Sequence, residues 1–166
     1  MRLTFSDARA SDAAAIVALR NSTAADLTAR FGAGHWTLRT SVPAVKRSLG
    51  RARIRIGKSG RRIVTVLTLS GRKPWAIDSK YFTPAKRPLY LIGMSVAVEH
   101  QRHGLGRRAL LDARKVATAW PADAIRLDSY VGRVGAGAFY RKNGYQRRGQ
   151  KRCWGLPLLY YELLLP

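Results

Sequence analysis

The alternation of apolar and polar positions along the chain predicts a mixture of strands and helices. The strongest helix pattern runs from Gly104 to Trp120, where apolar residues recur at helical spacing, and the strongest strand pattern, Leu89–Val98, precedes it. The same criteria predict helices over residues 13–30, 42–49 and 135–142, and strands over residues 3–5, 53–56, 63–69, 124–127, 145–147 and 158–165. Residues 57–60 are expected to form the turn of a hairpin. This order predicts an α+β fold with one central mixed sheet of about seven strands and about four flanking helices.

Length and composition fit one domain and exclude several classes of protein. The chain has 166 residues, enough to bury a core, and contains no low-complexity linker, so we expect a single domain over residues 1–166. No apolar run reaches the roughly 18 residues of a membrane span, and the first residues lack a signal-peptide pattern. The one cysteine, Cys153, belongs to no cluster with metal-ligand spacing. The sequence therefore predicts a cytoplasmic protein without a membrane segment or a bound metal.

The charge balance is the unusual feature of the composition. Lysine and arginine number 31 against 9 aspartate and glutamate residues, a net charge of +22. Such an excess favours anionic partners, such as nucleic acid or phosphorylated cofactors. Because 23 of the 31 basic residues are arginine, the codon bias of a GC-rich genome is an alternative explanation.

Part of this charge is concentrated in a stretch that has no acidic residue, from Leu27 to Ile77. In the run 51–55 arginine alternates with small or apolar residues, which predicts a strand with one basic face. We expect that face to be either a solvated surface or a docking surface for a polyanion, because nothing within the stretch neutralises it. A contact with nucleic acid or with the ribosome is therefore one possibility for this surface.

A turn with two glycines joins the strongest strand to the strongest helix. Gly104 and Gly106 allow the backbone to approach a ligand closely, and the unpaired N–H groups at a helix start attract anions. Arg102, Arg107 and Arg108 add positive charge at the same place. The segment predicts a phosphate or pyrophosphate site, although its spacing is neither that of a Walker loop nor that of a Rossmann fingerprint. A plain tight turn is the alternative.

Two motifs in order resemble those of a known family. The run 101–106, QRHGLG, resembles the Q/R-x-x-G-x-G/A signature of the GNAT superfamily of acyl-CoA-dependent N-acyltransferases. Residues 136–145 resemble the A-x-x-F-Y-x-K-x-G-F segment of the same family, and the start of the chain looks like an uncharacterised bacterial branch of it. The chain departs from the pattern at Val98, where the family often has proline, and at Arg133, where it often has asparagine. The resemblance implies a GNAT-like mixed sheet.

The resemblance also implies that acetyl-CoA is the co-substrate. In the family, backbone N–H groups of the signature loop hold the pyrophosphate, and exposed backbone of a bulged fourth strand pairs with pantetheine. On this basis the expected cofactor-binding residues are Met94, Ser95, Val96, Gln101, Arg102, His103, Gly104, Leu105, Gly106 and Arg107. Gly93, which directly precedes this strand segment, is consistent with the bulge.

The catalytic residues implied by the resemblance are a proton donor and a general base. Tyr140 matches the tyrosine that commonly protonates the departing CoA thiolate, and a structural role in the core is its alternative. The preferred base is Asp128, at the end of the fifth strand. Asp78, His35 and a chain of water molecules stay open as alternatives, whereas Glu99 fits a surface turn better.

Aromatic and polar residues in two loops predict the site for the acyl acceptor. The residues expected there are His35, Trp36, Trp75 and Asp78, with covering of the sheet edge as the alternative role of the aromatic rings. We expect an N-acetyltransferase that moves an acetyl group to a primary amine by direct attack in a ternary complex. Small amines, amino acids, peptide N-termini and aminoacyl-tRNA stay open as acceptors, and a homodimer is compatible with the family. The alternative function is a basic nucleic-acid- or ribosome-binding module on a GNAT fold with degenerate catalysis.

Overall fold

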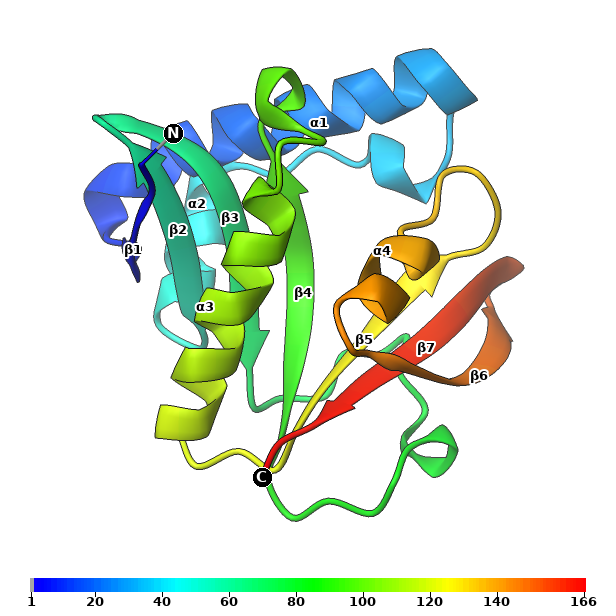
Figure 1. Cartoon of the computed structure of the whole chain (residues 1–166). Helices are drawn as coiled ribbons and strands as arrows, with labels where there is room; N and C mark the ends of the chain where they lie inside the picture. Colours follow the sequence, from blue (N-terminus) through cyan, green and yellow to red (C-terminus); the bar gives the residue numbers. More distant parts are fainter. Residues whose placement is uncertain (1) are drawn as a thin grey trace. The chain divides into compact units, whose positions relative to one another are not determined.

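The computed structural model describes residues 2–166 and contains the predicted seven strands and four helices (Figure 1). The strands are β1 (Thr4–Asp7), β2 (Arg53–Ser59), β3 (Arg62–Ser70), β4 (Pro88–Val96), β5 (Ala124–Tyr130), β6 (Gln146–Cys153) and β7 (Leu156–Leu164). The helices are α1 (Ala13–Phe31), α2 (Val42–Leu49), α3 (Leu105–Ala119) and α4 (Gly137–Lys142), with short 3-10 turns η1 (Ala10–Asp12), η2 (His35–Thr37), η3 (Ser79–Tyr81) and η4 (Val98–His100). The strands follow the order β1-β2-β3-β4-β5-β7-β6 in one mixed sheet, which confirms the predicted α+β class. Within residues 2–166, no helix combines the length and the apolar character that crossing a membrane requires.

Contacts between residues in space divide the chain into two compact units. Of the described residues, unit 1 comprises 2–69 and Ile92–Ala113, and unit 2 comprises Ser70–Leu91 and Arg114–Pro166. Strand β4 and helix α3 each begin in one unit and end in the other. Each unit is therefore built from two separate segments of the sequence.

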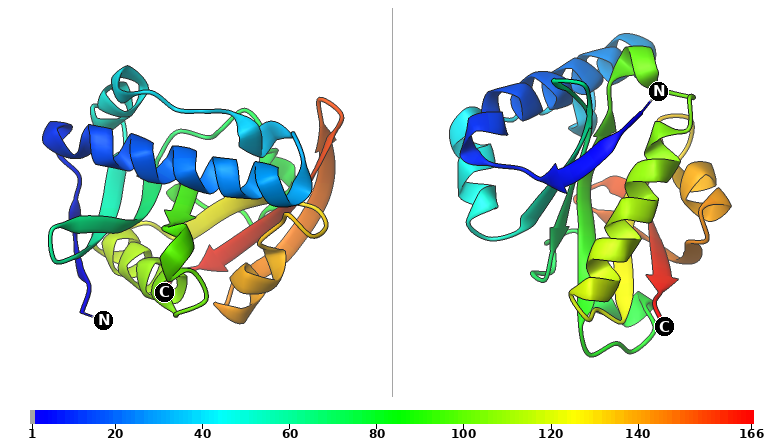
Figure 2. Two further views of the ribbon diagram at one scale, coloured as in Figure 1. Left: turned by 90° about the horizontal axis from the view of Figure 1, so that it is seen from above. Right: turned by 60° about the vertical axis from the view of Figure 1, so that its left-hand side comes forward.

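In unit 1, helices α1 and α2 lie against one face of β2 and β3, and the start of α3 lies against the other (Figures 1 and 2). Ile54 and Ile56 alternate with arginine along β2, so both isoleucines join the core beneath α1 and α2. Val66 pairs with Ile56 across the hairpin and faces the same side. The alternation of polar and apolar residues thus assigns one face of this hairpin to a core and leaves the arginines on the other.

The hairpin turn in unit 1 lies further along the chain than predicted. Residues 57–59 continue strand β2, and the turn falls at Gly60, whose φ is 58°. Gly57 is required inside the strand, because a Cβ there would lie 2.4 Å from Thr65 Oγ1 and 2.8 Å from the ring of Phe5. The glycine at position 57 therefore serves close packing rather than a turn.

The basic face of β2 is neutralised, contrary to the expectation from the local sequence. Arg55 makes two hydrogen bonds to Asp112 of α3, at 2.8 and 2.9 Å, and one to Asp7 at 3.0 Å. Arg53 donates to Asp7 at 2.8 Å, and this hydrogen bond is the largest factor that lowers the pKa of the Asp7 carboxyl. The acids come from β1 and α3, far from the arginines in the sequence, so the prediction of an unneutralised face was wrong. Arg55 and its acids serve structure here.

In unit 2, strand β7 pairs antiparallel with both β5 and β6, and the first residues of β4 pair with β5 in parallel. The β6–β7 hairpin is much longer than predicted, because the expected strands 145–147 and 158–165 extend to a tight turn at Trp154 and Gly155. A core cluster covers this hairpin and consists of Ala76, Ile77, Phe82, Tyr90, Cys153, Leu158 and Tyr160. The aromatic residues Tyr81 and Phe82 contact the ring of Tyr160 and thus belong to this packing.

A buried ion network connects three strands and a loop of unit 2. The Glu162 side chain is fully buried and accepts hydrogen bonds from Arg126 Nε at 3.0 Å and from Arg148 Nε at 2.8 Å. The backbone N–H of Thr83 also donates to Glu162, at 3.3 Å, while Arg126 donates to the carbonyl of Thr83. Because buried charges are tolerated only when they are paired, this network holds the 71–87 loop against β5, β7 and β6.

Candidate active site

The loop between β4 and α3 lies in unit 1 and has the geometry of an anion site. After β4 the chain turns through η4, and the Gln101 side chain donates back to the Val96 carbonyl at 3.1 Å. At the start of α3, the N–H of Arg108 donates to the carbonyl of Gly104 in this loop, at 3.2 Å. The N–H groups of residues 105–107 belong to the first turn of α3, where an α-helix supplies no acceptor. Those donors, with the positive end of the helix dipole, are available to a phosphate.

Backbone conformation keeps this loop open. Gly104 has a φ of 78°, and a Cβ built there would meet no atom within 4 Å, so the space above the loop is free. Arg102 is also left-handed, with a φ of 63°, which is uncommon for a residue with a side chain. The free amides, the open space and the flanking arginines fit a pyrophosphate group. The predicted residues 101–107 thus form one continuous segment of unit 1.

In the second half of β4, also in unit 1, Gly93 directly precedes residues 94–96, where a bulge was predicted. Gly93 has a φ of 58° inside the strand, which is typical of a β-bulge. The guanidinium of Arg20 from α1 lies beside it, since a Cβ on Gly93 would be 3.3 Å from Arg20 Nη2. Thr23, one turn further along α1, hydrogen-bonds Ser95 at 3.3 Å. Met94, Ser95 and Val96 are partly exposed, as residues that contact a ligand must be.

In unit 2, the two predicted catalytic residues lie within electrostatic range of each other. Burial raises the pKa of Asp128 above its usual value. Burial also raises the pKa of the Tyr140 phenol, and the nearby charge of Asp128 raises it further. The same carboxylate contributes to the raised pKa values of Tyr130 and Tyr160, in which burial is again the largest factor. The charge of Asp128 therefore acts on phenol groups of β5, β7 and α4.

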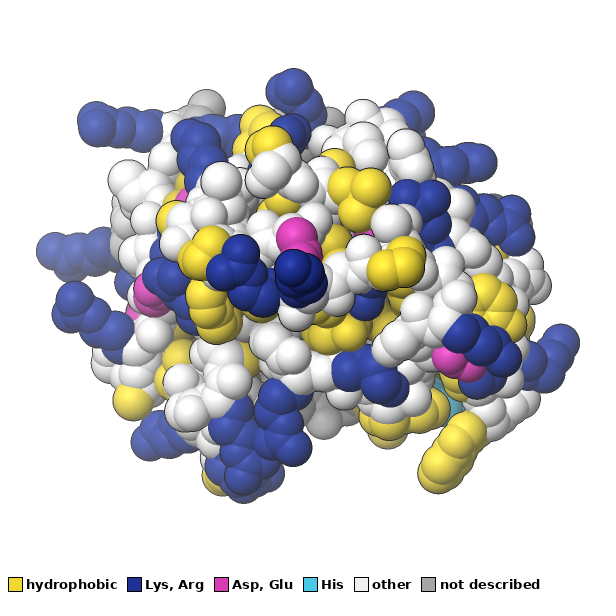
Figure 3. Space-filling view, turned by 90° about the horizontal axis from the view of Figure 1, so that it is seen from below, with side chains coloured by type: hydrophobic (Ala, Val, Ile, Leu, Met, Phe, Trp, Pro, Cys, Tyr) yellow, Lys and Arg dark blue, Asp and Glu magenta, His cyan; other side chains and the backbone are white. Residues whose placement is uncertain are grey.

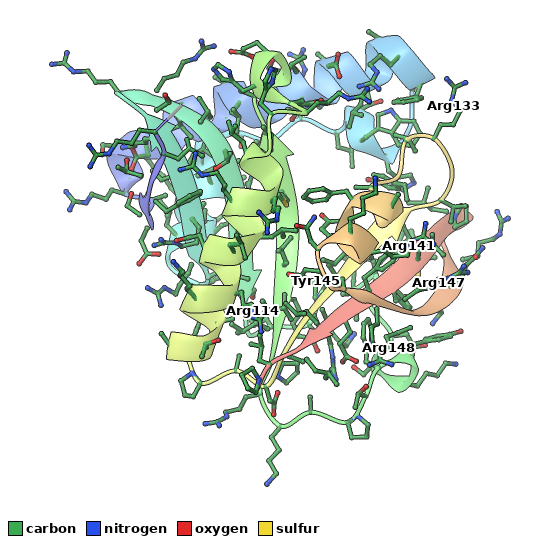
Figure 4. The ribbon with its side chains drawn as sticks, in the orientation of Figure 1. Arg114, Arg133, Arg141, Tyr145, Arg147 and Arg148 are labelled. Atoms are coloured by element: carbon green, nitrogen blue, oxygen red, sulfur yellow. The ribbon has the colours of Figure 1, made fainter. Side chains whose placement is uncertain are left out.

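Helix α4 carries Tyr140 and is attached to β5 at its start. Its first turn is held by the N–H of Ala136, which donates to Ser129 Oγ of β5 at 3.0 Å. The ring of Tyr140 packs edge-on against Tyr145 and lies 6.0 Å from the Tyr161 ring. Figure 4 shows Tyr145 beside α4, and its buried hydroxyl has no hydrogen-bond partner in the described structure. Tyr140 therefore sits in a rigid aromatic cluster with its phenol retained in the neutral form.

Gly137→Ala is expected to lower the stability of unit 2 and to disturb Tyr140. A Cβ at position 137 would come within 2.2 Å of the Tyr161 hydroxyl, and this buried ring cannot move freely. The clash costs about 1–3 kcal/mol, more than the roughly 0.5–1 kcal/mol that alanine gains in a helix. Thermal unfolding followed by circular dichroism measures the loss as a lower Tm. Gly71→Ala is the control, because a Cβ there meets no atom within 4 Å; equal Tm values for both variants would contradict the contact.

The predicted acceptor residues fall into two groups. Trp75 and Asp78 of unit 2 line one hollow of about 330 Å³, together with Lys73, Ala76, Ile77, Ser79 and Lys151. Asp78 is already paired with Lys151 at 2.7 Å, a hydrogen bond that is the largest factor lowering its pKa and that makes it a poor base. His35 and Trp36 form η2 in unit 1, where the Trp36 indole donates to the Gly32 carbonyl at 3.0 Å.

Sequence reasoning missed Lys151 and Trp154, which lie at or beside this hollow. The Trp75 and Trp154 rings are 5.5 Å apart although 79 positions separate them in the sequence. A hairpin turn between two long strands was the available signal, but the turn residue is tryptophan instead of the usual asparagine or glycine. Glu99, which was expected to be a surface residue, is exposed and pairs with Arg62. No cluster of metal-ligating side chains occurs among residues 2–166.

The mixed sheet, with a loop and a helix after its central strand β4, matches the fold of solved acetyltransferase structures. The chain belongs to the GNAT family of acetyltransferases, whose family model matches residues 61–145. Members of this family use acetyl-CoA. No curated protein sequence matches the chain significantly.

Solved structures match the fold over nearly the whole chain. An N-acetyltransferase from Staphylococcus aureus Mu50 matches with a TM-score of 0.74 and 15% identity, and 100% of both chains is covered. The ribosomal-protein-S18-alanine N-acetyltransferase of Escherichia coli matches with a TM-score of 0.73 and 14% identity, and the match covers 98% of this chain and 94% of that one. The structure of a Salmonella typhimurium protein with its cofactor acetyl-CoA matches with a TM-score of 0.70 and 16% identity, and the match covers 99% of this chain and 94% of that one. At these identities the likeness shows the fold alone.

Proposed function

We propose that the protein transfers an acetyl group from acetyl-CoA to a primary amine by direct attack in a ternary complex. The observation that carries this proposal is the 101–107 loop, with free amides at the start of α3 and open space above Gly104. When bound, acetyl-CoA supplies an activated thioester. The loop amides bind its pyrophosphate, and the exposed backbone of residues 94–96 orients its pantetheine arm.

Asp128 is the proposed general base. An attacking amine must lose a proton, and a carboxylate accepts it more readily when its own pKa lies closer to neutral. Burial shifts the pKa of Asp128 in that direction, whereas ion pairing shifts the pKa of Asp78 in the opposite direction. The raised pKa supports Asp128 over Asp78 for this role.

Tyr140 is the proposed proton donor to the departing sulfur. Its phenol stays protonated at neutral pH because burial and the charge of Asp128 both raise its pKa. Proton donation prevents the accumulation of a free thiolate, which would reverse the reaction. Base and acid are then adjacent groups of unit 2, with separate tasks.

The hollow beside Trp75 and Asp78 is the proposed acceptor site in unit 2. Tyr160 pairs with Asp128 across β5 and β7, and its hydroxyl donates to the carbonyl of Ala76 in the wall of the hollow. The hollow is thus connected to the proposed base through one side chain. One structurally similar enzyme acts on an alanine of a ribosomal protein, so a peptide N-terminus stays a candidate acceptor beside small amines, amino acids and aminoacyl-tRNA.

Isothermal titration of nucleic-acid-free protein with acetyl-CoA at physiological salt tests the cofactor half of the proposal. We expect saturable binding near one molecule per chain, and Gly104→Val should weaken it at least about tenfold, because a branched side chain in the loop obstructs the phosphate and the amides. Gly60→Val is a matched control. Both glycines have positive φ and open surroundings, so both variants carry a similar backbone strain of about 1–2 kcal/mol.

Gly60 lies in the β2–β3 turn of the same unit, and its variant should bind acetyl-CoA as the wild type does. Equal affinity of the two variants would refute the placement of the pyrophosphate on the 101–107 loop. An absence of binding by the wild type would refute the proposed function itself.

A further inference from the structure

Two tryptophans in unit 2 form an exposed aromatic pair. Trp154 is 89% exposed and Trp75 is 66% exposed, yet their ring centroids lie only 5.5 Å apart with the planes inclined at 53°. Tryptophan is the largest side chain and is normally buried over most of its surface. An exposed pair of this kind contributes little to folding, which indicates contact with a partner.

Buried contacts beneath the rings fix this pair in place. Ala76 and Cys153, the next neighbours of the two tryptophans, are each 9% exposed, and the Cys153 thiol donates to the Ala76 carbonyl at 3.4 Å. The buried hydroxyl of Tyr160 donates to the same carbonyl. The two segments are therefore attached to each other directly below the rings. A partner would meet a preorganised surface and would not have to order it.

The turn that carries Trp154 has a strained conformation for this residue. Trp154 has a φ of 51° and Gly155 a φ of 80°, so both turn residues are left-handed. This is the pattern of a type I′ hairpin turn, in which asparagine or glycine is the usual first residue. A bulky residue that occupies such a position without being buried stabilises neither the turn nor the core. Its occurrence here is an outlier of the kind that marks functional positions.

The surroundings of the pair are basic. Lys73 and Lys151 line the adjacent hollow, and Arg152 precedes the turn and donates to the Gly155 carbonyl at 2.7 Å. The one acid of the hollow, Asp78, is paired with Lys151 and also lies 3.6 Å from the Lys80 ammonium. Strand β6 as a whole carries four basic residues and no acidic one.

Positive charge continues from this strand onto its neighbours. Further arginines of unit 2 are Arg141 of α4, Arg147 of β6 and Arg133 of the loop before α4 (Figure 4). Basic side chains are spread over the face drawn in Figure 3, where acidic side chains are few. The tryptophan pair thus lies beside Lys73 and Arg152, which give this aromatic surface an electropositive environment.

We propose that the tryptophan platform, formed by Trp75, Trp154, Lys73 and Arg152, binds a single-stranded segment of nucleic acid. Unpaired bases stack on exposed aromatic rings irrespective of their identity, and the phosphates between them require cations at the rim. The platform supplies both kinds of contact on a rigid support. A duplex offers only its phosphates, because its bases are stacked on one another.

Other partners fit this surface less well. A second copy of the chain would bring another basic surface against it, with a net charge of +22 on each molecule, and would be repelled. The basic face of β2, where the sequence alone suggested a polyanion, is neutralised by Asp7 and Asp112. The tryptophan platform has stacking rings in addition to charge. The platform shares Trp75 and Lys73 with the hollow proposed for the acceptor, and its binding of a single strand is tested without acetyl-CoA.

The test is fluorescence anisotropy with a short labelled oligouridylate and full-length protein at physiological salt. The wild type should bind the single strand more tightly than a duplex of the same length. Trp75→Ala and Trp154→Ala should each weaken single-strand binding by about 5- to 150-fold, the usual effect of losing one stacked base. Trp154→Asn removes the ring while it suits the left-handed turn, so it separates the loss of stacking from any unfolding. Trp120→Ala is the tryptophan control. Trp120 directly follows α3 and is 36% exposed, and this variant should bind as the wild type does.

Charge is tested in parallel with a matched pair of variants. Arg152→Gln should reduce the slope of log affinity against log salt by about 0.7, whereas Arg47→Gln, which removes an exposed charge of α2, should leave it unchanged. Three results would overturn the proposal. They are equal binding by the tryptophan variants and the wild type, duplex binding as tight as that of the single strand, and a dimer that dissociates when Trp154 is replaced.

Discussion

Asp128→Asn is expected to lower the rate of acetyl transfer about 10²- to 10⁴-fold while leaving acetyl-CoA affinity within about twofold. The asparagine keeps the size of the side chain but accepts no proton from the attacking amine. The loss should fall on kcat and kcat/KM alike, because proton transfer accompanies the chemical step. Steady-state kinetics with any accepted amine measure it, and acetyl-CoA titration measures the affinity. Asp26→Asn, at an exposed ion pair with Arg30 on α1, is the matched control and should keep full activity.

The pH dependence distinguishes a base from a structural carboxylate. Burial raises the pKa of Asp128 in the folded state, so the acidic limb of the wild-type rate profile should lie above the ordinary range of an aspartate and should vanish in the variant. The folded state then binds more protons than the unfolded state between the unfolded and the folded pKa, and stability falls as pH rises through that window. At a pH above this window, the ionised carboxylate of Asp128 lowers the free energy of unfolding. Asp128→Asn should therefore be at least as stable as the wild type at pH 7. A rate and a profile unchanged by the substitution would transfer the role to His35 or to water.

Glu162→Ala is expected to destabilise the protein by about 3–5 kcal/mol, the largest stability effect of any single substitution considered. The side chain of Arg126 is 5% exposed and would be left without its carboxylate, and Arg148 would lose its partner as well. For a chain of this size each kcal/mol lowers Tm by about 2–4 °C. Calorimetry or circular dichroism should therefore find a decrease of more than about 6 °C, or no folded protein at all.

Two further variants make this prediction specific. Glu162→Gln keeps an oxygen that accepts from Arg126 and should lose less stability than the alanine variant. Asp26→Ala removes an exposed ion pair between two residues one helical turn apart. It should lower the free energy of unfolding by no more than about 0.5 kcal/mol. A loss for Glu162→Ala as small as that for Asp26→Ala would mean that the network contributes nothing through burial.

Sequence reasoning succeeded where local signals determine structure. Helix α2 has the predicted bounds because Ser41 caps it and Pro43 fits its first turn. Helix α3 matches within one residue at each end because its apolar residues recur at a steady helical period. The 101–107 loop lies between β4 and α3 as predicted, because a short contiguous motif between a strong strand and a strong helix contains all its parts. Its role in cofactor binding stays a prediction.

It failed where partners are distant in sequence. Residues 128–130 and 148–152 are mostly polar or charged, so the strands that contain them were predicted too short. Arg148 and Lys151 are nevertheless paired within unit 2, with Glu162 and Asp78. The charge of Arg53 and Arg55 was read as free for the same reason. Composition counts charges but does not say which of them meet in the folded chain.

The division of the chain into two interleaved units has a consequence for synthesis on the ribosome. Residues 70–91 of unit 2 leave the ribosome before residues 92–113, which complete unit 1. At about 5–20 residues per second, that first segment of unit 2 waits several seconds for its own second segment. During this interval the backbone groups of Thr83 have neither Arg126 nor Glu162 to bind. Unit 1 thus has all its sequence while unit 2 is still incomplete, and the vectorial order of translation itself favours folding from the amino-terminal unit onward.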